Sequence, residues 1–325
     1  MTLTPAPFFT DIYTGPEGGA AYWVNTSDGV RIRVGYWPAK NAKGTVLLFP
    51  GRTEYIEKYA LCAAALAKRG YATLAVDWRG QGLADRLLDD PMIGHVGKFS
   101  DYQRDVAALL DTAEKLDAPK PMHLIAHSLG GCVGLRALMN GLDVASAVFS
   151  GPMWGINIGP HLRATAWALG RLMPYIGQGH RLARRSLVRP YVLSEPFANN
   201  TLTTDETMFA MMRDHLRAHP ELALAGPSFT WLRAALDETR SLASRPSPNV
   251  PCLTLLGTRE RIVDVGRVHD RMAAWPNGRL DLVDGAEHEP LMEGPEITEP
   301  LFDQIAEHFQ TSADQHTSGK SRAIG

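Results

Sequence analysis

Short apolar runs alternate with longer amphipathic stretches along most of the chain, and this pattern predicts a sheet covered by helices. The expected strands are mostly apolar runs at residues 45–49, 72–76, 123–127, 146–150, 252–257 and 279–283. The expected helices between them cover residues 54–69, 100–116 and 130–140. Apolar runs without alternation are typical of parallel strands that are buried on both faces. The chain therefore has the pattern of an α/β fold, with a mostly parallel central sheet and helices on both faces.

The pattern differs before the first of these strands and again between the fourth and the fifth. Residues 20–37 alternate apolar and polar positions around a Ser-Asp-Gly turn signal, which predicts a β-hairpin. Residues 151–248 have helical patterns and no strand-like run. Because open α/β sheets bind ligands at the carboxyl ends of their strands, we expect this insertion to form a helical cap or lid. The expected division is a core of residues 1–150 and 249–310, the lid at 151–248 and a flexible polar tail at 311–325.

Composition narrows the class of protein. Of the 325 residues, 45% are hydrophobic and 21% are charged, which is the composition of a globular protein. The net charge of -2 gives no reason to expect nucleic acid as a partner. No apolar run approaches the ~20 residues of a spanning helix, and the first twenty residues lack the basic segment of a secretory signal. We therefore expect a cytoplasmic protein, and an odd number of cysteines indicates free thiols, at Cys62, Cys132 and Cys252.

A candidate nucleophile lies between an expected strand and an expected helix. The segment Ala126-x-Ser128-x-Gly130 has the small-x-Ser-x-Gly spacing of a nucleophile elbow, in which a strained turn exposes the serine hydroxyl. Small residues on either side avoid a clash at this sharp turn. The helix N-terminus favours developing negative charge, and the amide of Leu129 is expected to donate to an oxyanion. His127 beside the serine is expected to be structural.

Three further positions complete the candidate site. The loop after the first core strand contains Arg52, whose amide is the expected second oxyanion donor. His288 follows the last expected strand and is the candidate base. The acid that orients it is Glu260 or Asp264; Glu260 is preferred because it follows its strand sooner, whereas Asp264 has the position of a helix N-cap. His215 and His219 lack a companion metal-binding motif and are expected on a solvated helix face.

Several motifs make the chain similar to a known group of enzymes. It resembles the bacterial lysophospholipases and the monoacylglycerol lipases, both α/β-hydrolases, in PGRTEYIEKY (50–59), DWRGQGLADRLLDDPMIGHVGKFSDYQRDV (77–106), AHSLGG (126–131), RERIVD (259–264) and GAEHEPLME (285–293). The resemblance implies a triad of Ser128, Glu260 and His288, with an oxyanion hole of the Arg52 and Leu129 amides. It further implies a lipid or ester substrate that is cleaved through an acyl-enzyme.

The expected lid has an unusual charge pattern. Between residues 153 and 194 there are six arginines, among them Arg184 and Arg185, and no aspartate, glutamate or lysine. Aromatic and aliphatic residues such as Trp154 and Trp167 are interleaved with them. Such a segment is able to contact an anionic membrane or a phosphate head group. The alternative is that the apolar side covers the pocket while the arginines face water.

Three functions remain open at this stage. The first is a serine hydrolase of lipid esters, a lysophospholipase or a monoacylglycerol lipase, that requires no cofactor and no metal. The second keeps the triad but acts on another substrate, as a small-ester esterase, an aminopeptidase or a C–C hydrolase. The third is a silent α/β-hydrolase fold that serves as a binding module. The acyl length, the head group, hydrolysis versus acyl transfer and the oligomeric state are left open.

Overall fold

The computed structural model describes residues 3–12, 15–183 and 188–323. Their strands are β1 (Thr4–Pro5), β2 (Ala20–Asn25), β3 (Arg31–Trp37), β4 (Gly44–Phe49), β5 (Tyr71–Asp77), β6 (Met122–His127), β7 (Ser146–Ser150), β8 (Cys252–Gly257) and β9 (Gly278–Val283). They form one sheet in the order β1-β2-β3-β5-β4-β6-β7-β8-β9. The strands β1, β2, β3 and β5 pair antiparallel, and every pair from β5 to β9 is parallel. The predicted parallel sheet and the β2–β3 hairpin are confirmed.

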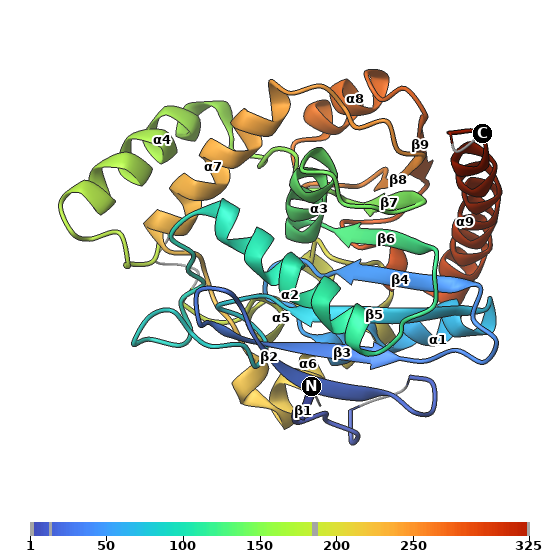
Figure 1. The fold of residues 1–325 in the computed structure, drawn as a ribbon. Coiled ribbons are helices and arrows are strands. Elements are labelled where there is room, and N and C mark those ends of the chain that lie inside the picture. The colour runs from blue at the N-terminus through green and yellow to red at the C-terminus, as the bar shows by residue number, and fades with distance from the viewer. Residues whose placement is uncertain (1–2, 13–14, 184–187, 324–325) are drawn as a thin grey trace.

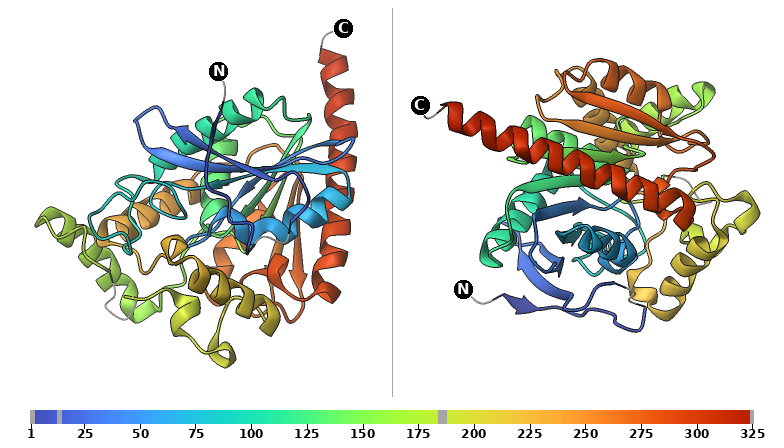
Figure 2. Two further views of the ribbon diagram at one scale, coloured as in Figure 1. Left: turned by 90° about the horizontal axis from the view of Figure 1, so that it is seen from below. Right: turned by 90° about the vertical axis from the view of Figure 1, so that its right-hand side faces the viewer.

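Helices cover both faces of this sheet (Figure 1). On one face lie α1 (Ala60–Lys68) and the long α9 (Pro295–Ala323), which crosses the sheet in Figure 2. On the other face lie α2 (Tyr102–Lys115), α3 (Leu129–Met139) and α8 (Val265–Ala273). Successive side chains of a strand point to opposite faces, so Leu124 and Ala126 of β6 join one core cluster and Ile125 joins the other. This two-sided burial explains the continuous apolar runs of the central strands.

Local differences from the predicted elements have physical causes. The expected helix over 54–69 begins later, at Ile56, with a 3-10 turn, η1 (Ile56–Tyr59), that leads into α1, because Thr53 has a positive φ of 68° and Tyr55 is extended, so both belong to the preceding loop. A second 3-10 turn, η2 (Phe99–Asp101), precedes α2, and no side chain caps that helix. The edge strand β9 is half exposed, because only one neighbouring strand shields it.

The C-terminal region also differs from the prediction. Where we expected a frayed tail from residue 311, α9 continues to Ala323. Phe302, Ile305 and Phe309 anchor the preceding turns in the core, and Ser312 is 3% exposed. Once a helix is nucleated by such packing, each further residue adds a hydrogen bond at little extra entropic cost. Anchoring of the earlier turns therefore lets the helix extend into the polar residues.

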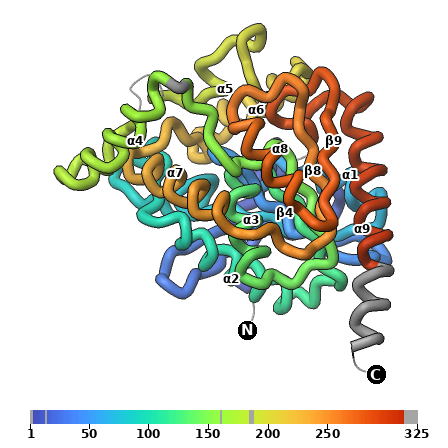
Figure 3. Tube along the Cα trace, turned by 90° about the horizontal axis from the view of Figure 1, so that it is seen from above, coloured from blue at the N-terminus to red at the C-terminus, as the bar shows by residue number. Residues whose placement is uncertain are grey.

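The segment between β7 and β8, here called the insertion (residues 151–251), consists of helices and loops. Its helices are α4 (Pro160–Tyr175), α5 (Tyr191–Ser194), η4 (Phe197–Asn199), α6 (Glu206–Ala218), η5 (Pro220–Leu222) and α7 (Phe229–Ala243). Figures 1 and 3 show α4 and α7 lying side by side at one end of the molecule. Within the described part of the chain, no helix combines the length and apolar character needed to cross a bilayer.

Candidate active site

Ser128 stands at the sharp turn between β6 and α3. Its φ of 49° and ψ of -114° lie in a region that non-glycine residues rarely adopt, and such strain is typical of functional positions. Gly130 makes the turn possible, because a Cβ there would lie 2.0 Å from the carbonyl oxygen of Phe49. The turn therefore has both steric features on which the prediction of an elbow was based, a strained serine and a neighbour that must be small.

His288 and Glu260 reach Ser128 from the ends of the last two strands. The distance from His288 Nε2 to Ser128 Oγ is 2.9 Å, and that from His288 Nδ1 to Glu260 Oε2 is 2.6 Å. The side chains of His288 and Glu260 are 4% and 1% exposed. Because a carboxylate only accepts hydrogen bonds, Nδ1 carries the proton and Nε2 is left to accept the serine hydroxyl. This is the tautomer that a general base needs.

The electrostatic surroundings of Glu260 favour its ionised form. Burial by itself would raise the pKa of this carboxyl. The hydrogen bond and the charge of His288, together with the amides of Ile262 and Val263 on Oε1, outweigh burial and hold the pKa below its usual value. Asp264, the alternative acid, caps α8 by accepting from the amide of Arg267 and does not contact His288. The structure thus brings Glu260, and not Asp264, to the histidine.

The loop after β4 carries Arg52, which lines the same pocket as Ser128. Trp78 Nε1 donates to Pro50 O at 2.9 Å, and Gln81 Nε2 donates to Gly51 O at 2.8 Å. The amide of Gly51 donates to the Glu54 carboxylate. Gly130 at the start of α3 packs against the carbonyls of Phe49 and Pro50, so this loop and the N-terminus of α3 lie together. The two predicted oxyanion donors, Arg52 and Leu129, are on these adjoining segments.

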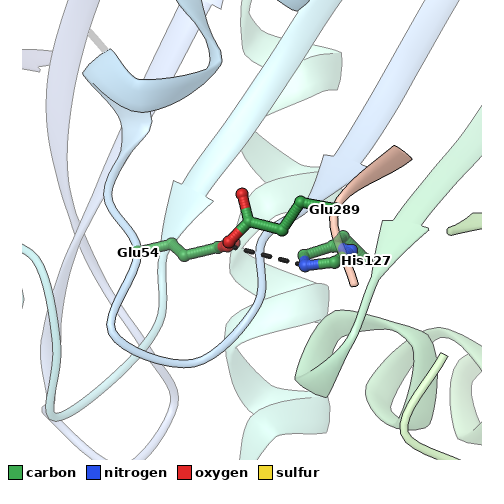
Figure 4. Close-up of side chains that lie close together, drawn as sticks. All are labelled: Glu54, His127 and Glu289. Atoms are coloured by element: carbon green, nitrogen blue, oxygen red, sulfur yellow. Dashed lines mark ion pairs between the residues drawn. The ribbon is translucent and has the colours of Figure 1, made fainter. Parts of the chain in front are cut away.

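Beneath the loop lies a buried polar cluster that the sequence analysis missed, formed by Glu54, Lys58, His127 and Glu289. Figure 4 shows Glu54, His127 and Glu289 of this cluster. Carboxylate and imidazole atoms of Glu54, His127 and Glu289 lie within 4.8 Å of one another, a spacing suited to a metal ion. However, Lys58 Nζ already bonds Glu54 Oε1 at 2.7 Å and Glu289 Oε2 at 2.6 Å. The ammonium supplies the positive charge, so we assign no metal here. The i,i+4 spacing of Glu54 and Lys58 was the available sequence signal.

The charges of this cluster are set by burial and by shared hydrogen bonds. Burial would raise the pKa of Glu54, but Lys58, His127 and the Tyr59 hydroxyl lower it below its usual value. Glu289 has fewer hydrogen bonds to its carboxylate, and burial raises its pKa. Burial also lowers the pKa of His127 to about 4. His127 is therefore neutral at pH 7 and donates from Nδ1 to Ser150 O at 2.8 Å, the structural role predicted for it.

A pocket of about 370 Å³ opens above Ser128 and His288. Its walls are mainly apolar, and the insertion supplies Met212, Leu216, Leu224, Trp231 and Leu232. The insertion is held to the histidine loop by backbone hydrogen bonds from His288 N to Thr201 O and from Glu289 N to Leu202 O. An apolar pocket of this size with a few convergent polar groups is typical of a site for a small ligand.

The residues named for the lid do not share one location. Trp154 is 3% exposed, packs against Phe149 and Trp275, and donates to Gly131 O, so it belongs to the core and does not line the pocket. Trp167 lies on α4, with the guanidinium of Arg171 5.3 Å from its ring. Arg184 and Arg185 lie outside the described residues.

The expectation for the paired histidines was wrong for one of them. His215 is 5% exposed, and burial lowers its pKa to about 4. His219 stacks on Phe9 and contacts Asp11. His215 therefore faces the interior of the protein, because α6 packs its apolar side against the segment that follows β4.

A mostly parallel sheet with a serine on a strand–helix elbow, and with an acid and a histidine after later strands, is the architecture of the α/β-hydrolases. The molecule has this fold, as predicted. A model of the serine aminopeptidase S33 family matches residues 40–295, and the chain belongs to this family. Belonging to this family agrees with the prediction that the chain is an enzyme.

Relatives of known name and structure are similar over most of the chain. Lysophospholipase L2 of Escherichia coli (strain K12) is 31% identical, over 87% of this chain and 85% of that protein. Monoglyceride lipase of Homo sapiens is 25% identical, over 86% of each chain. A soluble variant of monoglyceride lipase from Saccharomyces cerevisiae, solved with a substrate analog, superimposes with a TM-score of 0.68 at 20% identity, over 95% of this chain and 99% of that one. The resemblance to lysophospholipases and monoacylglycerol lipases is confirmed.

Proposed function

We propose that this protein is a lysophospholipase that hydrolyses the acyl ester of a lysophospholipid through an acyl-enzyme on Ser128. The observation that carries the proposal is the hydrogen-bonded series Ser128–His288–Glu260 at the base of an apolar pocket. The similarity to lysophospholipase L2 over most of both chains supports the choice of substrate. The apolar walls suit an acyl chain, because apolar surface removed from water contributes about 25 cal/mol per Å².

The proposed reaction has two steps. Ser128 Oγ attacks the ester carbonyl carbon while its proton passes to His288 Nε2, and the oxyanion accepts hydrogen bonds from the amides of Arg52 and Leu129. The glycerophosphoryl alcohol leaves with the proton from His288. A water molecule then attacks the acyl-enzyme, with His288 as the base, and the fatty acid is released. Glu260 keeps the imidazole in its working tautomer and stabilises the imidazolium.

A second candidate is hydrolysis of a monoacylglycerol. It is favoured by the similarity to human and yeast monoglyceride lipases and by the apolar character of the pocket. Both candidates use the same triad and differ only in the group that leaves with the alcohol. The two candidates are therefore distinguished by which substrate is hydrolysed faster, because their mechanism is the same.

Turnover of three substrates tests the proposal. A lysophospholipid, a monoacylglycerol with the same acyl chain and p-nitrophenyl butyrate are compared, with Ser128→Ala as control. We expect the largest kcat/KM for the lysophospholipid, and neither turnover nor fluorophosphonate labelling in the variant. A preference for the monoacylglycerol would support the second candidate. Activity that survives in Ser128→Ala would contradict the mechanism, and a wild-type chain that neither turns over a substrate nor labels would indicate a binding module.

We further propose that the insertion is a lid and that it contacts the inner face of an anionic membrane. Most of the exposed large apolar side chains of the described protein lie on it: Leu162, Leu169, Leu172, Tyr175, Ile176, Val188 and Leu193. Arg163, Arg171, Arg181 and Arg189 are exposed beside them, and residues 153–194 contain no acidic residue. Apolar side chains beside basic ones suit an interface of acyl chains and anionic head groups.

Vesicle binding tests this part of the proposal. Arg171→Glu should weaken binding to vesicles that contain anionic lipid by at least about fivefold, since each basic residue near the surface contributes ~1 kcal/mol. Lys40→Glu is the matched control. Lys40 is exposed in the turn before β4, and Ser128 follows the carboxyl end of the parallel strand β6, so the two residues lie at opposite ends of the strands. Equal effects of the two variants, or no effect of Arg171→Glu, would contradict membrane contact through the insertion.

A further inference from the structure

The side chain of Arg52 has surroundings that the proposed reaction does not use. It lines the same pocket as Ser128 and is directed toward the insertion. One guanidinium nitrogen, Nη2, donates to Ala225 O, and the guanidinium lies 5.5 Å from the centre of the Trp231 ring. The nitrogen Nε is buried and has no hydrogen-bond partner among the described residues. The described residues therefore satisfy only part of the donor capacity of this guanidinium.

Two buried arginines of this protein are neutralised by carboxylates, whereas a third one, Arg271, uses its donors on the carbonyls of Leu242 and Arg245 and on the Ser247 hydroxyl. Arg33 pairs with Glu57 and Asp77, and Arg79 pairs with Asp105. Among the described residues, no carboxylate lies within ion-pair distance of Arg52. Arg52 is partly buried, and its removal from water lowers the pKa of the guanidinium to about 10, so it still carries its charge at pH 7; such a charge is stabilised by an anionic partner.

We propose that the Arg52 guanidinium binds the phosphate of the lysophospholipid while its acyl ester lies at Ser128. This inference rests on the proposed function and assigns a specificity-determining residue within it. In such a lipid only the glycerol unit separates the ester from the phosphate, and Arg52 contributes to both regions through its amide and its side chain. A guanidinium presents parallel N–H donors that match two phosphate oxygens. A neutral monoacylglycerol would leave the same charge unpaired, which disfavours it as a substrate.

Direct binding of two inert probes tests this assignment. Dodecyl phosphate and the ether 1-O-dodecylglycerol have the same alkyl chain, differ in charge and contain no carboxylic ester for Ser128 to attack. Their dissociation constants are measured by titration calorimetry below their micelle concentrations. The wild-type chain should bind the phosphate at least about tenfold more tightly than the ether. In Arg52→Gln this preference should be lost, and Arg52→Lys should retain part of it, because lysine keeps the charge without the planar fork.

Arg86→Gln is the matched control. Arg86 also joins the core to the insertion, through the carbonyls of Glu221 and Ala223, but it does not line the pocket. This variant should keep the wild-type preference for the phosphate. If Arg52→Gln does not fold, the wild-type preference and its partial retention in Arg52→Lys decide the question.

Two outcomes would overturn the assignment. One is a wild-type chain that binds both probes equally, and the other is a loss in Arg52→Gln that is the same for both probes, as expected for a purely structural tie. Because neither probe is hydrolysed, the result is independent of turnover. Lysophospholipid turnover without a phosphate preference would remove only the role of Arg52. A phosphate preference that depends on Arg52, in a chain that does not cleave lysophospholipid, would support the anion site and remove only the proposed substrate.

Discussion

Replacing Glu260 with glutamine should nearly stop catalysis by changing the tautomer of His288. In the wild type, Glu260 Oε1 accepts from the amides of Ile262 and Val263 at 2.6 and 3.1 Å, and Oε2 accepts from His288 Nδ1. In Glu260→Gln the side-chain carbonyl oxygen must stay with the two amides, because leaving buried donors unpaired costs about 1–3 kcal/mol each. The side-chain NH2 group then faces Nδ1 and donates to it. The imidazole proton moves to Nε2, which can no longer accept the proton of Ser128.

The size of the loss follows from the same geometry. A carboxylate-to-amide exchange in a Ser-His-Asp triad lowers kcat by about 10⁴, which corresponds to about 5 kcal/mol at 1.36 kcal/mol per decade. We expect a loss of this order for Glu260→Gln, since both partners are buried and the 2.6 Å bond is direct. Asp264→Asn should stay within about twofold of the wild type, because asparagine caps a helix as well as aspartate does.

Hydrolysis of p-nitrophenyl butyrate gives kcat for each variant, and the rate of fluorophosphonate labelling reports the reactivity of Ser128 without turnover. Thermal unfolding followed by circular dichroism shows whether the fold is retained. More than about a tenth of wild-type kcat in Glu260→Gln would refute the tautomer argument. A loss in Asp264→Asn as large as that in Glu260→Gln would reassign the acid.

Two further predictions concern the elbow and the polar cluster. Gly130→Ala should abolish soluble folded protein or activity, because its Cβ would meet the Phe49 carbonyl at 2.0 Å. The control Gly97→Ala should be tolerated, since its Cβ has its nearest contact at 3.9 Å. Expression and thermal unfolding test the pair, and a stable, active Gly130→Ala would refute the steric argument. The pKa of His127 is lowered to about 4 by burial, so the unfolded chain, with a histidine pKa of ~6.5, takes up a proton that the folded chain does not as the pH falls from 7 to 5. Protonation of His127 in the unfolded chain should therefore lower the unfolding free energy of the wild type by about 2 kcal/mol over this interval, and His127→Asn should lose correspondingly less. Urea unfolding at pH 7 and at pH 5 measures both losses. Equal losses in the two proteins would contradict the assignment to His127.

Much of the fold and part of the candidate site were determined by local sequence. The apolar runs predicted the parallel strands because burial on both faces requires uninterrupted apolar side chains. The elbow was evident from Ala126-x-Ser128-x-Gly130 because the steric demand of the turn lies within a few residues. His288 and Glu260 were found by their places after strands, since parallel strands end at one edge of the sheet and bring their following loops together. That Ser128, Glu260 and His288 catalyse the reaction stays a prediction.

The remaining features were decided by contacts between residues far apart in the chain. Lys58 reaches Glu289 across 231 positions and joins the segment after β4 to the histidine loop, which no local pattern reveals. Asp264 was separated from Glu260 as the acid only by which side chain meets the imidazole. Trp154 looked like part of a lid, but packing against Phe149 and Trp275 placed it in the core. The sequence pointed to Arg52 only for its backbone amide. The surroundings of its guanidinium, which donates to Ala225 O of the insertion and has no carboxylate partner among the described residues, are evident only from the tertiary structure. Local sequence specifies backbone conformation and which faces are buried, whereas the partner of a buried charge depends on which distant segment packs against it.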